Sequence, residues 1–89
     1  MATGRRFDRL VVIKTRWAGT AARIGSVREA ANCLIASEWP RPHGPKYIAA
    51  VRACHDALAG EVTTEAARQA FIAAAAEAGI LIGEKPVRG

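Results

Sequence analysis

Apolar residues recur at every second position between residues 9 and 17, ahead of the first helical segment. A period of two is typical of a strand that buries one face, and the β-branched residues frequent in this stretch favour a pleated surface. A turn around Gly19 leads to a shorter segment, residues 22–25, which predicts a partner strand with Ile24 directed inward. The inward positions of the first strand are Val11, Ile13, Thr15 and Trp17.

A first helix is predicted over about residues 27–38. Ser26 and Glu29 form a capping box, in which each side chain bonds a backbone amide that the helix leaves without a partner. Pro40 ends the helix, because the residue before a proline is disfavoured in the helical conformation. The apolar stripe of this helix consists of Val27, Ala30, Ala31, Leu34 and Ile35.

A second helix is predicted over about residues 45–59. Gly44 takes the cap position, and Pro45 takes the first helical position, where its missing amide costs nothing. Gly60 ends the helix as a residue that adopts the left-handed conformation. The expected inner stripe consists of Tyr47, Val51, Cys54 and Leu58.

A third helix is predicted over about residues 64–78. Thr63 or Thr64 caps its start, Gly79 ends it, and Ile80 is placed to fold back on it in a Schellman arrangement. The expected inner stripe is mostly alanine, so a neighbouring helix can approach closely. The stripe consists of Ala67, Phe71, Ala74 and Ala78.

These elements predict an α+β fold, in which an N-terminal β-hairpin packs on three helices and the first helix is central. Residues 80–82 are compatible with a short strand added to the edge of the hairpin. The 89 residues suffice for one domain, which we expect to span 7–82 between flexible tails at 1–6 and 83–89.

The chain has no apolar run of the ~20 residues that a membrane-spanning helix needs. The apolar stretch behind the N-terminal arginines is also shorter than the roughly 7 to 15 residues of a signal peptide. We therefore expect a cytoplasmic protein that does not bind membranes. Disulfides are rare in reducing compartments, so Cys33 and Cys54 are expected to be free thiols, with a single bridge between them as the alternative.

The net charge of +5 is unevenly distributed, because residues 1–28 hold seven of the basic residues and one acidic residue. Such asymmetry is compatible with a polyanion-binding end, and equally with a solvated face that binds nothing. No aromatic residues interleave with these charges, as stacking on nucleic acid bases would require. The candidate contacts to a polyanion are Arg9, Lys14, Arg16 and Arg23.

No residue pattern in the chain indicates catalysis, a cofactor or a metal site. Zinc sites usually contain close pairs such as C-x₂₋₄-C or H-x₃₋₅-H, and neither occurs. Cys54 and His55 are adjacent, so on a helix their side chains diverge by about 100°. A catalytic thiol needs a base within hydrogen-bond reach, which this divergence prevents. We therefore expect a protein that is not an enzyme.

The stiff connector between the first two helices offers the best candidates for a recognition surface. It reads WPRPHGP, with three prolines in seven residues. Trp39 has a second reading, in which it closes one end of the core. Ile72, off the stripe of the third helix, either packs on the hairpin or tail or marks a partner contact. The candidate contacts to a partner are Trp39, His43, Tyr47 and Ile72.

These observations favour a small interaction or regulatory module that binds a protein partner, as a monomer or weak dimer. The alternative is a nucleic-acid-binding protein that uses the basic hairpin. The chain also resembles, over residues 7–82, a family of short proteins of unknown function common in rhizobia and related alphaproteobacteria. That resemblance implies the same hairpin and three helices, and no activity or ligand. It rests on Trp39-Pro40, Cys54 and Ala67-Arg68-x-Ala70-Phe71.

Overall fold

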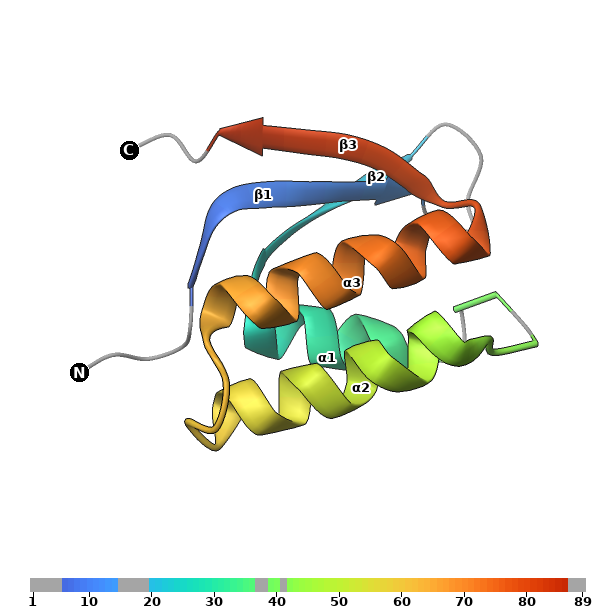
Figure 1. Cartoon of the computed structure of the whole chain (residues 1–89). Helices are drawn as coiled ribbons and strands as arrows, with labels where there is room; N and C mark the ends of the chain where they lie inside the picture. The colour runs from blue at the N-terminus through green and yellow to red at the C-terminus, as the bar shows by residue number, and fades with distance from the viewer. Residues whose placement is uncertain (1–5, 15–19, 37–38, 41, 87–89) are drawn as a thin grey trace.

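The computed structural model describes residues 6–14, 20–36, 39–40 and 42–86, which form an α+β fold (Figure 1). The expected hairpin and the three expected helices are all present. The elements are β1 (Arg6–Lys14), β2 (Ala21–Ser26), α1 (Val27–Ile35), α2 (Pro45–Leu58), α3 (Thr64–Ala78) and β3 (Leu81–Pro86).

The three strands form one antiparallel sheet in the order β2-β1-β3, with β1 at its centre. Val11 lies opposite Ile24 of β2 and Glu84 of β3. The expected edge strand is therefore present, but it is longer than the sequence indicated. It continues through Pro86, into residues that we had assigned to a flexible tail, because pairing with β1 orders a polar segment that has no apolar pattern of its own. The predicted strand positions Thr15 and Trp17 lie outside the described residues.

All three helices lie on one side of the sheet (Figure 1). α1 packs against β2, and α3 packs against β1 and β3, while α2 covers both helices on the side away from the sheet. The expectation that α1 would be central is wrong. α3 takes that position because it is the longest helix and carries small side chains on more than one face, so that it contacts both the sheet and α2.

The core contains few large side chains, and alanine fills much of the contact between α2 and α3. The residues buried on α2 are Ala50, Cys54 and Ala57, so the inner stripe predicted for this helix is confirmed only in part. Of that stripe, Cys54 is buried, Tyr47 and Val51 are partly buried against the core, and Leu58 is 39% exposed. The small residues face inward because they allow α2 to approach the alanine face of α3. The alanines of α3 in this core are Ala67, Ala74 and Ala75.

The chain ends its helices largely where the sequence indicates. Thr63 caps α3, since its Oγ1 accepts a hydrogen bond from the Ala66 amide at 3.0 Å. Gly79 adopts a left-handed φ of 77°, and the Ile80 amide donates to the Ala75 carbonyl at 3.0 Å, as a Schellman arrangement requires. The chain needs glycine at position 79 because other residues adopt this φ at a cost.

α1 differs from its prediction at both ends. The Ser26 side chain caps the helix as expected, but the Glu29 carboxylate accepts from the amide of Gly25, at 2.7 Å, and not from that of Ser26. The helix ends at Ile35, about three residues early, and Ala36 is extended. This early exit allows Trp39 to turn back into the core, where it is 4% exposed.

Candidate interaction surface on α2

The four residues proposed as partner contacts occupy different environments. Trp39 is buried between Tyr47 and Phe71, with ring centroids 6.0 and 5.7 Å away. It closes one end of the core, which is the second reading of its sequence context, and its indole is not available to a partner in this structure. Ile72 is partly buried and packs against the core. His43 is exposed and stacks on Tyr47 at a centroid distance of 3.7 Å.

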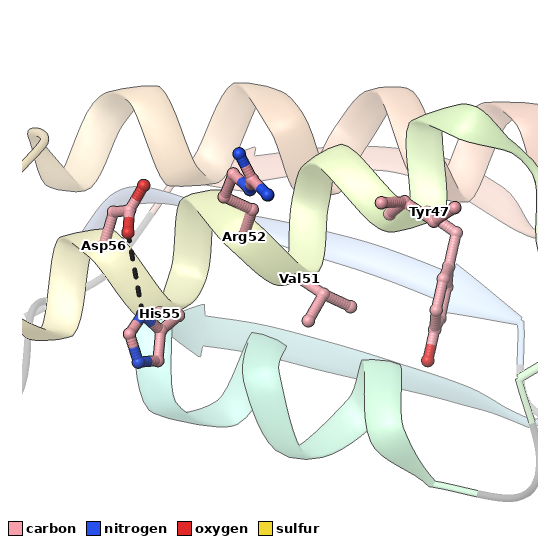
Figure 2. Close-up of a pocket in the computed structure, with 6 residues that line it drawn as sticks. Tyr47, Val51, Arg52, His55 and Asp56 are labelled. Carbon is pink, nitrogen blue, oxygen red and sulfur yellow. Dashed lines mark ion pairs between the residues drawn. The ribbon is translucent and has the colours of Figure 1, made fainter.

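Tyr47 is held in place between α1 and α2. Its hydroxyl donates to the backbone carbonyl of Leu34 at 2.7 Å. This carbonyl lies in the last turn of α1, where helix carbonyls have no partner within the helix. The bond therefore completes the end of α1 and fixes the tyrosine ring, which points from α2 toward α1 in Figure 2.

A groove of about 470 Å³ runs along the outer surface of α2 (Figure 2). Tyr47, Val51 and His55 project to the side of α2 that faces α1, while Arg52 and Asp56 project to the opposite side. The groove is lined by Tyr47, Ile48, Val51, Arg52, His55 and Asp56.

Two large apolar side chains of α2, Ile48 and Leu58, are exposed and lie outside the core. Ile48 is 62% exposed, and Ile35, at the end of the neighbouring α1, is 70% exposed. We call the residues Ile48, Val51, His55 and Leu58 the α2 stripe. They follow a spacing of three, four and three residues, which places them on one side of the helix. Sequence analysis missed this stripe because it assigned Leu58 to the core and did not single out Ile48, while Val51, which is partly buried, borders both surfaces.

A second hollow, of about 300 Å³, lies at the start of α2. The Glu77 carboxylate reaches it from α3 and accepts a hydrogen bond from the Lys46 amide at 3.2 Å. The hollow is lined by Trp39, Pro40, Pro42, Gly44, Tyr47, Glu77 and Ala78.

The candidate polyanion contacts are divided between the two faces of the sheet. Lys14 and Arg23 lie on the face away from the helices, since strand pairing places Arg23 beside Val12 and side chains alternate along each strand. Lys85, opposite Leu10, joins them there. Arg9 lies on the helix-facing side, 3.6 Å from the Glu84 carboxylate. Arg16 lies outside the described residues.

Arg68 is a buried charge that the sequence did not reveal. It is 7% exposed and donates to both oxygens of Glu65, at 2.9 and 2.8 Å, and to the Glu84 carboxylate of β3. Hydrogen bonds from Arg68 and Gln69 lower the pKa of Glu65 to about 2, and the bond to Glu65 raises the pKa of Arg68. The ion pairs join α3 to β3. The sequence places Glu65 and Arg68 three residues apart, so this pair could have been recognised. Glu84 could not, because residues 83–89 were expected to form a flexible tail.

The thiols and imidazoles do not come together in the described part of the chain. Cys54 is fully buried, and burial raises its pKa to about 11. His55 points outward with an 83% exposed side chain, 3.6 Å from Asp56. No disulfide joins Cys33 to Cys54, as expected. Among the described residues no three side chains of the metal-ligating types form a group that could hold an ion.

Residues 9–82 match the family model DUF982, described as a protein of unknown function. The chain belongs to the DUF982 family. No curated protein and no solved structure matches it.

The DUF982 match extends from β1 to the second residue of β3, so it includes the α2 groove and Arg68. None of the described helices has both the length and the hydropathy that crossing a membrane requires.

Proposed function

We propose that this DUF982 protein is a non-enzymatic interaction module whose binding surface is the α2 stripe. The observation that supports the proposal is the orientation of α2. Ala50, Cys54 and Ala57 fill the core, whereas Ile48 and Leu58 are in contact with solvent. Exposed apolar surface is unfavourable by roughly 25 cal/mol per Å² relative to burial, so covering the stripe would stabilise a complex.

The groove also has the form of a protein-binding surface. Tyr47, Ile48 and Val51 form its apolar part, and the polar residues Arg52, His55 and Asp56 line the rest. Interfaces commonly place a buried apolar centre within a polar rim. Tyr47, fixed by its bond to α1, adds a rigid aromatic side chain at one end, and tyrosine is among the residues enriched at binding hot spots.

Photo-crosslinking at a single position tests the proposal. A photoreactive phenylalanine analogue is placed at Ile48 and the protein is irradiated in cells of its source organism. The matched control carries the same analogue at Ala66, which is exposed on α3 away from the groove. We expect defined adducts from position 48 and none from position 66. The absence of adducts at position 48, or equal adducts at both positions, would refute the proposal.

A second candidate function, binding of nucleic acid, is favoured by one observation. Lys14, Arg23 and Lys85 lie on the sheet face away from the helices, and none forms an ion pair with another described residue. Cations arranged in this way can follow a phosphate backbone, with an affinity that falls steeply as salt increases.

Fluorescence anisotropy with single-stranded and duplex probes tests this second candidate. Binding at low salt should weaken by tenfold or more in the variant Lys14→Glu/Arg23→Glu. Arg28→Glu/Arg52→Glu makes the same charge change on helices and should retain most of the affinity. Equal weakening in both variants would indicate an effect of net charge alone, and no binding at low salt would exclude the candidate.

A further inference from the structure

We infer that the α2 stripe binds a second copy of this chain, with the two α2 helices antiparallel across a two-fold axis. This inference rests on the proposed function and names the partner. Four observations carry it: the spacing of the stripe, the order of residues along it, the charges at its border and the position of α2 in the fold.

The spacing of the stripe matches the contact surface of paired helices. Ile48, Val51, His55 and Leu58 are separated by three, four and three residues, as the inward positions of a coiled coil are. The helix of 14 residues is about 21 Å long at 1.5 Å per residue, so the stripe spans most of it. One edge of the stripe borders α1, where Tyr47 is already fixed, so the other helix has a rigid surface to pack on.

The order of residues along the stripe makes it complementary to itself. In a two-fold dimer the same patch is used by both copies, and residue i contacts j while j contacts i. With the axis between positions 51 and 55, Ile48 of one copy meets Leu58 of the other. Val51 then meets His55, whose exposed ring can stack over the isopropyl group. Both apolar ends of the stripe are covered by this single arrangement.

The charges at the border are compatible with this register. Arg52 and Asp56 project on the same side of α2 (Figure 2). In an antiparallel pair of identical helices, equivalent sides face each other. With the axis at position 53, Asp56 of one copy is offset from Arg52 of the other by about 3 Å along the helices, which the long arginine side chain can span. The two-fold axis therefore produces two ion pairs. In a parallel two-fold pair these sides would lie on opposite flanks of the contact, and the two ion pairs would not form.

The position of α2 also limits repulsion between two chains that each carry a charge of +5. α2 lies on the side of the molecule away from the sheet (Figure 1). Lys14, Arg23 and Lys85 are on the outward face of that sheet, so the cations of the two copies would be separated by both molecules. Screening at physiological salt acts over about 8 Å and reduces their repulsion further.

Sedimentation velocity over a range of concentrations tests the inference. The wild type should dimerise reversibly. Arg52→Asp and Asp56→Arg, each alone, should weaken the dimer by about tenfold or more, because symmetry turns two attractive pairs into two repulsive ones. The double variant Arg52→Asp/Asp56→Arg should recover affinity to within about threefold of wild type. Circular dichroism and urea unfolding verify that each variant is folded.

The outcomes distinguish this inference from the proposed function. A chain that remains monomeric at millimolar concentration, or a double variant that fails to recover, overturns the antiparallel dimer. Should photo-crosslinks from position 48 then lead to a different protein, the interaction module stands without self-association. A chain that remains monomeric and also gives no crosslinks at position 48 overturns both the antiparallel dimer and the interaction module. Adducts with twice the chain mass, together with recovery of dimer affinity in the double variant, support the antiparallel dimer and the interaction module.

Discussion

The Glu77 carboxylate of α3 caps the start of α2 by accepting a hydrogen bond from the Lys46 amide at 3.2 Å. The N-cap residue of α2 is Gly44, which has no side chain to serve this purpose. A carboxylate at a helix start also interacts favourably with the helix dipole. The end of α3 is thus tied to the beginning of α2 through a residue distant in sequence.

Replacing Glu77 with alanine should lower the free energy of unfolding by about 1 kcal/mol, the usual effect of removing a helix cap. Urea denaturation measures the change. Glu61→Ala, in the exposed loop between α2 and α3, removes the same charge and should change stability much less. Equal losses in both variants would show that net charge, and not the cap, is responsible.

Gly44→Ala should also destabilise the protein, but only while Glu77 is present. A Cβ atom at position 44 would lie 2.5 Å from the nearest oxygen of Glu77. The flexible glutamate can move away, at the expense of its bond to α2. Because the two changes disrupt the same contact, their effects on the free energy of unfolding should not add. Full additivity in a double-mutant cycle would contradict the steric explanation.

Glu84→Ala should destabilise the junction between α3 and β3. The change removes one of the two carboxylates that bind the buried Arg68 guanidinium, and Glu65 remains. Since the Glu84 side chain is 35% exposed, water screens the pair, and we expect a loss of only about 1 kcal/mol, below the roughly 1.5–3 kcal/mol of bonds to charged groups. Glu84→Gln, which keeps an acceptor oxygen, should lose less. Urea unfolding of both variants provides the measurement.

Stability should fall in acid partly through Glu65. Its folded-state pKa of about 2 lies below the value of about 4.3 expected in the unfolded chain. The stabilisation is therefore present above about pH 4.3 and lost as the pH falls toward 2. The difference in unfolding free energy between wild type and Glu65→Gln should shrink between pH 6 and pH 2.5. A difference that stays constant with pH would contradict the role assigned to the Arg68 bond.

Cys54 should resist thiol reagents in the folded protein. Its side chain is inaccessible, and a pKa of about 11 keeps it protonated at pH 8, whereas the thiolate is the reactive form. In a Cys33→Ser variant, labelling should be slow without denaturant and fast in urea. Labelling at the rate of a free thiol under native conditions would show that this part of the core opens readily.

Local signals allowed most of the fold to be predicted. Ser26, Thr63 and the glycines at helix ends act through contacts within a few residues, so their roles could be read without a tertiary structure. The orientation of α2 could not be predicted from such local signals. Two stripes compete on this helix, one of large apolar residues and one with Ala50 and Ala57. The choice depends on the alanine face of α3, a distant partner that the periodicity of α2 does not reveal.

The candidate site was predicted only in part for the same reason. Tyr47 was identified, but Ile48 was not, and Leu58 was placed in the core although it is 39% exposed. Trp39 was named as a surface candidate, although its neighbours in space, Tyr47 and Phe71, bury it. Glu84 had no role in the sequence pattern because its partner, Arg68, approaches it only after β3 joins the sheet.

The position of β1 has a consequence for how the chain acquires its structure. β1 precedes the other described elements in the chain, yet one of its two neighbours in the sheet is β3, which follows all of them. During synthesis, the edge of β1 that pairs with β3 remains unpaired until the whole helical region and β3 have been made. Unpaired strand edges favour aggregation, so translation is the period when this small protein is most vulnerable to misassembly.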